Sequence, residues 1–266
     1  ICTEIESFLS QGKSMEWIAD HYSLDMPLLW ATRLQEKSDL ERMEEVNFPI
    51  RPYDVWNFAN CHKLCGIDYP GRIPGQIVAN VLYFYTQPGD LVIDPMAGGG
   101  TIIDVCLLMN RHCYGYDVSP TEERNDILHL DFAKELPAKS EKANLLFLDP
   151  PYFKKKEKEY PEGSISALNK QEYLKFFADM FSNTYQAMKE GSYLVLLMSN
   201  YDDTGNLDES IWIWDYVHLM TKAGWQVVRE IQCPIPNQVI HPDTINKFTA
   251  GKKLARLGRS LIVTRK

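Results

Sequence analysis

A carboxylate, two prolines and an aromatic ring follow a short apolar run in the stretch Leu-Asp-Pro-Pro-Tyr, residues 148–152. Residues 145–148 are all apolar, which is typical of a strand buried on both faces. Neither proline has an N–H group to donate to a sheet, so the strand is expected to stop at Asp149. The sequence therefore predicts that the Asp149 carboxylate, the Pro150 carbonyl and the Tyr152 ring lie together at the carboxyl end of a strand, where open α/β sheets bind ligands.

A glycine-rich loop, Asp-Pro-Met-Ala-Gly-Gly-Gly-Thr at residues 94–101, joins another apolar run to a predicted helix. Its glycines allow a sharp turn and a close approach to a ligand, and the helix start offers free N–H groups. The spacing fits neither the G-x-G-x-x-G dinucleotide fingerprint nor a P-loop ending in Gly-Lys-Ser/Thr. Because Asp94 would repel a phosphate here, the loop favours a ligand with a cationic end.

The acidic residue Asp117 closes the next predicted strand, about 20 residues after Asp94, where a carboxylate commonly accepts hydrogen bonds from ribose hydroxyls. A ribose, a positive centre and a carboxylate together describe S-adenosylmethionine. The alternative is a glycine turn that serves only strand–helix packing, and the two flanking carboxylates favour the cofactor.

The elements that must position these residues alternate between strands and helices, which predicts an α/β fold with a mostly parallel sheet and helices on both faces. Gly191 and Gly224 are expected to close two of the helices. The predicted strands are 91–94, 112–118, 126–133, 144–149, 193–200, 225–233 and 259–265, and the predicted helices are 76–86, 101–110, 170–189 and 209–224.

The N-terminal residues 1–48 are interpreted as a small helical segment with a linker, and residues 49–266 as the main domain. Apolar residues on either side of a polar break at 21–23 indicate two short helices joined by a tight turn, the layout of a helix-turn-helix. The stretch resembles the helical segment of ParB-like DNA-binding proteins. The alternative is a helical arm for packing or dimerisation.

The composition narrows the class of protein. The net charge of −8 argues against a broad nucleic-acid-coating surface, although basic residues cluster locally. Six scattered cysteines and the absence of a visible signal peptide or transmembrane run indicate a cytoplasmic protein with reduced thiols and no membrane association. The sequence Cys-His-Lys-Leu-Cys, residues 61–65, lacks a second ligand pair at zinc spacing, so no metal site is expected.

The two motifs together resemble those of the amino methyltransferases that modify exocyclic nitrogens of nucleic-acid bases, with usual forms D-P-F-x-G-x-G-T and D/N/S-P-P-Y/F/W. The glycine motif precedes the Asp-Pro-Pro-Tyr motif, as in the gamma arrangement of that family. Pro70 and Pro74 are similar to the two prolines of the family's methionine-side segment. The resemblance covers residues 50–266 and departs from the family only at Met96, where Phe is common, and at the extra Gly99.

The resemblance implies a Rossmann-like seven-stranded methyltransferase sheet, S-adenosylmethionine as cofactor and DNA as partner. It also implies three groups of site residues. The catalytic group is Asp149, Pro150, Pro151 and Tyr152; the cofactor group is Asp94, Pro95, Met96, Ala97, Gly98, Gly100, Thr101, Asp117, Asp131 and Pro74; the nucleic-acid group is Lys154, Lys155, Lys156, Lys252, Lys253 and Arg256. Asp117 would hold the ribose, and Asp131 would approach the adenine amino group.

The chemistry implied is direct methyl transfer. An exocyclic amine is a poor nucleophile because its lone pair is delocalised into the ring. The Asp149 carboxylate and the Pro150 carbonyl would accept hydrogen bonds from its two N–H groups and so expose the nitrogen lone pair. Positioning and electrostatics would then supply most of the catalysis. Tyr152 would stack on the target base, which in duplex DNA must first be flipped out.

Several alternatives remain open from sequence. Asp-Pro-Pro-Tyr leans toward adenine N6, with cytosine N4 second, and RNA guanine N2 methylation uses similar turns. A DNA-binding regulator with a degenerate methylase fold is the non-enzyme alternative. The sequence also leaves open whether the protein acts with RNA, as a homodimer, or with a further domain before residue 1.

Overall fold

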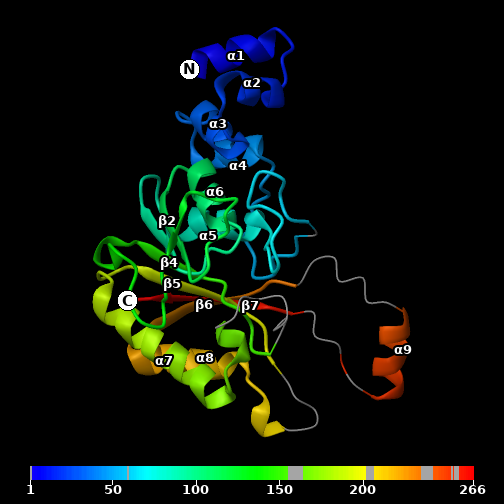
Figure 1. Cartoon of the computed structure of the whole chain (residues 1–266), viewed down its shortest axis with the longest axis vertical. Coiled ribbons are helices and arrows are strands. Elements are labelled where there is room, and N and C mark those ends of the chain that lie inside the picture. The colour runs from blue at the N-terminus through cyan, green and yellow to red at the C-terminus, as the bar shows by residue number, and fades with distance from the viewer. Residues whose placement is uncertain are drawn as a thin grey trace.

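The computed structural model describes residues 2–58, 60–154, 164–201, 207–234, 242–252, 254 and 258–266. Its centre is a seven-stranded sheet with the strand order β3-β2-β1-β4-β5-β7-β6 (Figure 1). The predicted α/β, Rossmann-like fold is confirmed. The strands are β1 (Leu91–Asp94), β2 (His112–Asp117), β3 (Ile127–His129), β4 (Leu145–Leu148), β5 (Tyr193–Met198), β6 (Gln226–Gln232) and β7 (Ser260–Arg265).

The first five strands of the chain pair in parallel, and β7 inserts antiparallel between β5 and β6. The β1–β4 pairing sets Val92 beside Leu145 and Ile93 beside Leu146. All four residues of β4 are buried. Adjacent parallel strands end at the same edge of a sheet, so the glycine loop after β1 and the proline turn after β4 meet there.

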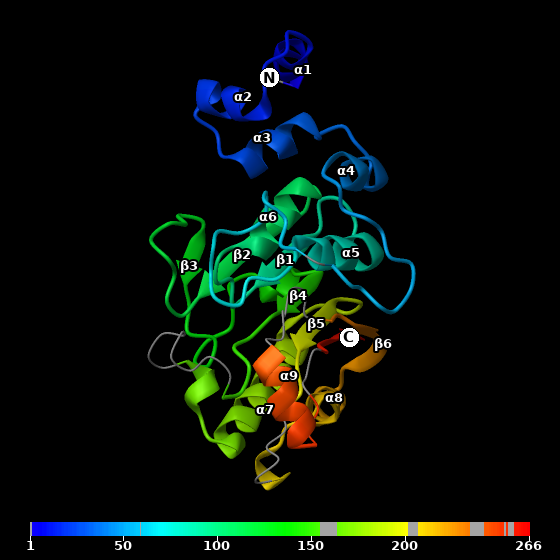
Figure 2. The same cartoon turned by 90° about the vertical axis from the view of Figure 1, so that its right-hand side faces the viewer.

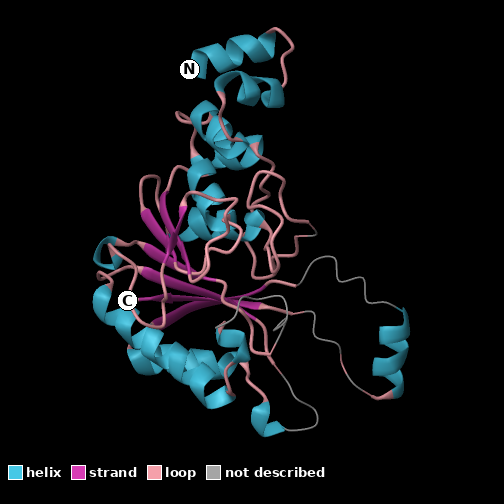
Figure 3. Ribbon diagram, in the orientation of Figure 1, coloured by secondary structure: helices cyan, strands magenta, loops and turns pink. Residues whose placement is uncertain are grey.

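Helices cover both faces of the sheet (Figure 3), as the alternation of elements predicts. One face packs against α5 (Gly75–Tyr85) and α6 (Thr101–Leu108), and the other against α7 (Lys170–Ala187) and α8 (Ile213–Ala223). Gly224 caps α8 in the left-handed conformation, as expected. The expectation for Gly191 was wrong, because α7 ends at Ala187 with Met188 as its cap, and Gly191, at φ 78°, turns the chain into β5. A further helix, α9 (Pro242–Ala250), lies in a segment with no predicted element.

The N-terminal segment forms four short helices, α1 (Cys2–Ser10), α2 (Met15–Tyr22), α3 (Met26–Arg33) and α4 (Asp39–Glu45). A small apolar cluster of Ile5, Ile18, Ala19 and Leu29 holds the first three together. α3 and α4 lie over α6 and α5, and α1 and α2 extend beyond α3 (Figure 2). The DNA-binding role of these helices stays a prediction.

Buried arginines fasten α4 to the main body. The Arg42 side chain donates to the carbonyls of Gln35 at 2.8 Å, Lys37 at 2.9 Å and Leu108 at 2.9 Å. Arg111, just after α6, donates both guanidinium nitrogens to the carboxylate of Asp39. Four residues of this region join the apolar core under the sheet: Leu34, Met43, Val46 and Phe48. The predicted domain boundary at residue 48 stays a prediction, but α4 packs as part of the main core.

We predict that Arg42→Ala lowers the free energy of unfolding by about 2–4 kcal/mol, because three carbonyls lose a charged donor in a buried setting. Urea unfolding followed by circular dichroism measures the loss. Lys222→Ala, at an exposed position on α8, is the control and should change stability by no more than about 0.5 kcal/mol. Equal losses for the two variants would contradict the anchoring role of Arg42.

Candidate active site

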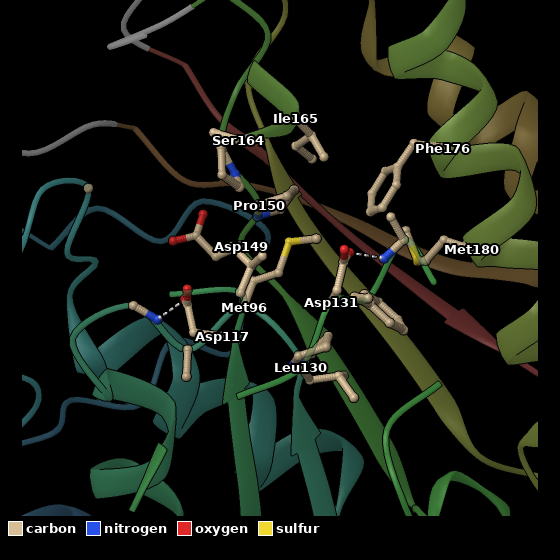
Figure 4. Close-up of a pocket in the computed structure, with 18 of the residues that line it drawn as sticks. Met96, Asp117, Leu130, Asp131, Asp149, Pro150, Ser164, Ile165, Phe176 and Met180 are labelled. Atoms are coloured by element: carbon tan, nitrogen blue, oxygen red, sulfur yellow. Dashed lines mark hydrogen bonds between the residues drawn. The ribbon is translucent and has the colours of Figure 1, made fainter. Parts of the chain in front are cut away.

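A cavity of about 1150 Å³ opens at the carboxyl edge of the sheet. Its walls come from the ends of β1, β2 and β4, from the segment 69–74 before α5, and from α7 (Figure 4). Pockets for a single small ligand usually enclose roughly 300–1000 Å³. The cavity is therefore large enough for a cofactor and part of a second ligand.

The glycine loop is shaped by what packs over it. A Cβ on Gly99 would lie 2.7 Å from the Cβ of Tyr69. Gly100 has φ 81°, and a Cβ there would lie 2.5 Å from the guanidinium carbon of Arg124. The extra glycine, Gly99, thus has a structural reason, since the segment before α5 crosses directly over the loop.

An ion-pair network that the sequence analysis missed holds that segment in place. Arg124 donates both terminal nitrogens to the two oxygens of Asp104 on α6, each at 2.9 Å. Asp104 also accepts from the backbone N–H of Gly66 at 2.7 Å, and the N–H of Ile67 donates to the carbonyl of Gly99 at 3.0 Å. Burial raises the pKa of Asp104 despite Arg124. No sequence motif predicts this network, because its residues come from segments that are far apart in the chain.

Asp117, at the end of β2, lines the cavity as predicted. One carboxylate oxygen accepts from the N–H of Gly98 and the other from the N–H of Ser119, both at 2.9 Å. Burial raises its pKa, and the two N–H donors oppose that shift. Each carboxylate oxygen has a second lone pair, so Asp117 can also accept from a hydroxyl in the cavity.

Asp131 lies across the cavity from Asp117, beside the apolar Leu130 and Phe132. It accepts from the N–H of Ala133 at 3.1 Å and pairs with Lys134 at 2.6 Å. The hydrogen bond to Lys134 lowers its pKa. An acidic acceptor between apolar side chains suits an aromatic ligand that carries an amino group.

The four residues predicted to be catalytic, Asp149, Pro150, Pro151 and Tyr152, all contribute to the wall of the cavity. The Tyr152 hydroxyl donates to the Asp149 carboxylate at 3.2 Å. Tyr173 of α7 donates to the carbonyl of Pro151 at 3.0 Å and fixes the turn from behind. The sequence analysis assigned no role to Tyr173, whose only sequence signal is its place on the apolar face of a helix.

Two predicted cofactor residues do not reach the cavity wall. Asp94 is fully buried behind the glycine loop and accepts from the N–H of Met96 at 3.2 Å. Its other oxygen meets no donor within the described residues. Gly100 lies under Arg124 at the start of α6. The structure thus gives both residues a part in shaping the loop. The other eight residues of the group line the cavity: Pro74, Pro95, Met96, Ala97, Gly98, Thr101, Asp117 and Asp131.

The predicted nucleic-acid residues are only partly covered by the structure. Lys154 pairs with Glu209 at 3.1 Å and stacks over the ring of Phe153. Lys252 follows α9 and is exposed. Lys155, Lys156, Lys253 and Arg256 lie outside the described residues.

The cavity also has walls that the sequence analysis did not identify. Phe176 and Met180 of α7 face the space beside Asp131 (Figure 4). Three further residues line it: Tyr69, which packs over the glycine loop, Arg72 and Arg259. In the described part of the chain, no group of three or more His, Cys, Asp or Glu side chains could hold a metal ion. Nor is any helix in those ranges long and apolar enough to cross a membrane.

Residues 10–126 match the model of the DNA methylase family, N6_N4_Mtase, over a segment that includes the glycine loop and Asp117. Type II methyltransferase M.BglII of Bacillus subtilis is 33% identical over 97 residues, which is 35% of this chain and 27% of that protein. Type II methyltransferase M.HpaI of Haemophilus parainfluenzae is 31% identical over 71 residues, which is 26% of this chain and 22% of that protein. Over these segments the chain is similar to the amino-DNA methyltransferases, a family that uses S-adenosylmethionine.

The matches span only about a quarter of the length of these relatives. Among solved structures, TrmN from Thermus thermophilus aligns with 73% of this chain and 49% of its own, at 14% identity and a TM-score of 0.45. A geranyl diphosphate methyltransferase in complex with GPP and sinefungin aligns with 89% of this chain and 97% of its own, at 11% identity and a TM-score of 0.47.

We predict that Gly100→Ala destabilises the protein more than Gly89→Ala does. Both glycines have positive φ, 81° and 86°, but a Cβ on Gly89 meets nothing within 4 Å, whereas one on Gly100 collides with Arg124. The shared backbone strain costs about 1–2 kcal/mol in each variant. Displacing Arg124 from Asp104 should add about 1–3 kcal/mol in Gly100→Ala alone. Urea unfolding of the two variants tests this, and equal losses would refute it.

We also predict that Asp94→Asn is at least as stable as the unmodified protein near pH 8. Burial raises the pKa of Asp94 well above its usual value, so ionisation of this carboxyl disfavours the folded state. As pH falls through the raised folded-state pKa, the unmodified protein gains stability relative to the variant, and the gain is complete below the unfolded pKa of about 4. Unfolding free energies of both proteins from pH 8 to pH 4 give the difference, and a difference independent of pH would contradict it.

Proposed function

We propose that this protein transfers a methyl group from S-adenosylmethionine to an exocyclic amino nitrogen of a DNA base, with adenine N6 the first choice. The observation that carries the proposal is the position of the Asp149 and Pro150 turn on the wall of the cavity that the glycine loop also lines. A carboxylate and a peptide carbonyl are acceptors for the two N–H bonds of one amino group.

The residues present fit the cofactor. Asp117 would accept from the ribose hydroxyls, Asp131 from the adenine amino group, and the loop of residues 96–101 would border the methionine part. Leu130, Phe132 and Phe176 give an apolar lining for the adenine ring. When bound, S-adenosylmethionine supplies a methyl group activated by a positive sulfur.

The chain's own residues would prepare the amine. Pro150 and Pro151 stiffen the turn, and the bond from Tyr173 to the Pro151 carbonyl holds it against α7. The Tyr152 hydroxyl orients the Asp149 carboxylate. Asp149 and the Pro150 carbonyl would then accept hydrogen bonds from both N–H groups of the amine, which favours a tetrahedral nitrogen with an exposed lone pair. Pro150 is buried and Asp149 is partly buried, which strengthens their electrostatic effect on the amine relative to bulk water.

The choice of base rests on the sequence. Asp-Pro-Pro-Tyr favours adenine N6, and cytosine N4 is the alternative because its amine has the same two N–H bonds. Guanine N2 in RNA is a third candidate. The non-enzyme alternative, a regulator with a degenerate site, is disfavoured by the shared cavity that the two motifs line.

The decisive experiment incubates the protein with radiolabelled S-adenosylmethionine and unmethylated plasmid DNA or total RNA, followed by nucleoside analysis. We expect N6-methyladenine in the DNA. N4-methylcytosine would move the assignment to the second base, and label in RNA alone would refute DNA as substrate. No label in any nucleic acid, together with no cofactor binding by calorimetry, would favour the regulator.

We predict that Asp149→Ala abolishes methyl transfer and leaves cofactor affinity within about threefold. Loss of a positioned acceptor typically costs 10²–10³ in rate, roughly 3–4 kcal/mol of activation free energy. Glu190→Ala, at an exposed carboxylate that does not line the cavity, serves as the control and should retain full activity. Methyl transfer by Asp149→Ala at the normal rate would refute the role assigned to this carboxylate.

A further inference from the structure

Arg259 is a buried cation on the catalytic side of the cavity. It directly precedes β7, and its residue surface is 6% exposed. The backbone around it is fixed, because the N–H of Cys233 donates to the Arg259 carbonyl at 2.7 Å. Its side-chain Nε donates back to the Cys233 carbonyl at 3.3 Å. The guanidinium therefore has a defined place beside the end of β6.

One terminal nitrogen of that guanidinium, Nη2, is buried and meets no acceptor among the described residues. Within the same part of the chain, no carboxylate pairs with Arg259. Removing a cation from water costs several kcal/mol, and buried charges are normally paired or hydrogen-bonded. A buried donor without an acceptor, on a residue that lines the cavity, indicates that its acceptor arrives with the ligand.

The neighbours of Arg259 place it next to the catalytic turn. Arg259, Asp149 and Tyr152 line the same cavity. Ser260 pairs with Met198 at the carboxyl end of β5, and β5 pairs with β4, whose Leu148 directly precedes Asp149. Burial and the Asp149 charge raise the pKa of Tyr152, and the charge of Arg259 lowers it. The sheet therefore places the cation near the Asp149 turn.

The burial of Arg259 indicates which acceptor of a bound nucleotide its guanidinium would meet. A nucleotide offers two kinds, the phosphate oxygens and the ring nitrogens or carbonyls of the base. When a base is extruded, its phosphates remain on the outer path of the strand while the base enters the pocket. A guanidinium that is more than nine-tenths buried lies at the depth of the base.

We propose that Arg259 is a base-recognition residue, whose Nη2 donates to the ring acceptor adjacent to the target amine. This inference rests on the function proposed above. Adenine offers N1 at that position and cytosine offers N3, with its O2 carbonyl next in line. Guanine carries an N–H donor on N1, the Watson–Crick-side neighbour of its amine, and its other ring neighbour, N3, lies on the side of the glycosidic bond. With the Watson–Crick edge of the base toward Arg259, the guanidinium therefore meets an acceptor on adenine and cytosine but a second donor on guanine.

The first test compares Arg259→Met, Arg259→Lys and Arg265→Met. Arg265 is an exposed arginine on the following strand and is the matched control. Good contacts between arginine and a base are worth about 1–3 kcal/mol, so Arg259→Met should reduce kcat/KM for DNA roughly 10- to 100-fold. Cofactor affinity by calorimetry and the melting temperature should stay near those of the control. Arg259→Lys should restore only part of the loss, because an ammonium lacks the guanidinium's fork of donors.

The second test removes the acceptor instead of the donor. The methylated site is first mapped in plasmid DNA, and duplexes are then made with 1-deazaadenine or 3-deazacytosine at the target base. The unmodified protein should lose a similar 10- to 100-fold on the matching duplex. Arg259→Met should lose little more, since the contact is already gone.

The outcomes separate this inference from the function on which it depends. If the unmodified protein methylates no DNA, the proposed function fails and the inference falls with it. If it methylates the normal and the deaza duplex equally well, Arg259 does not read the ring acceptor, while the function stands. Should Arg259→Met fail to fold, the deaza duplex with the unmodified protein still decides between these results.

Discussion

The parallel pairing of β1 with β4 is the interaction on which the site depends. These strands are separated in the chain by α6, β2 and β3, yet they lie side by side at the centre of the sheet. Their register sets Ile93 beside Leu146, so both chains leave the sheet at the same edge. A glycine turn follows one strand and a proline turn follows the other. Neither turn alone makes a binding site, and the pairing makes them two walls of one cavity.

Buried carboxyl groups and one arginine hold the glycine loop in its conformation. Asp94 and Asp117 hold the backbone of the loop through N–H donors, and both carry pKa values raised by burial. Asp104 and Arg124 tie the loop to the segment that crosses it. Burial of carboxylates costs free energy, and it is offset here by backbone donors and one bidentate arginine. The loop is held firmly because moving it would leave these groups without partners.

The opposite side of the cavity is built differently. On this side α7 contributes Phe176 and Met180 to the wall, together with polar residues such as Glu172 and Asn183. Tyr173 of the same helix supports the proline turn. Arg259 comes from the C-terminal part of the chain. It lies at this edge of the sheet because β7 runs antiparallel to β5 and therefore begins where β5 ends. Polar and charged side chains therefore line the cavity on both the glycine-loop side and the α7 side.

The sequence by itself determined the fold class, the two motifs and the part of the cavity wall that these motifs, Asp117 and Asp131 supply. Apolar runs ended by Pro or Gly fix where strands stop, and a residue at the end of a parallel strand faces the binding edge whatever its neighbours are. Asp117, Asp131, Asp149 and Pro150 could therefore be placed before any coordinates. The end of α7 was predicted wrongly from Gly191. A glycine can cap a helix, but it can equally lie in the turn that follows the helix, as Gly191 does.

Only the tertiary structure decided which side chains from unrelated elements meet. Asp94 is adjacent to the glycine loop in sequence, but it is buried beneath the loop because its carboxylate turns inward to the N–H of Met96. No sequence motif identifies Tyr173, Arg124 or Arg259. Each of them donates a hydrogen bond to a residue at least 20 positions away in the chain. Long-range contacts depend on how the sheet and helices pack as a whole, and periodicity along the chain carries no record of them.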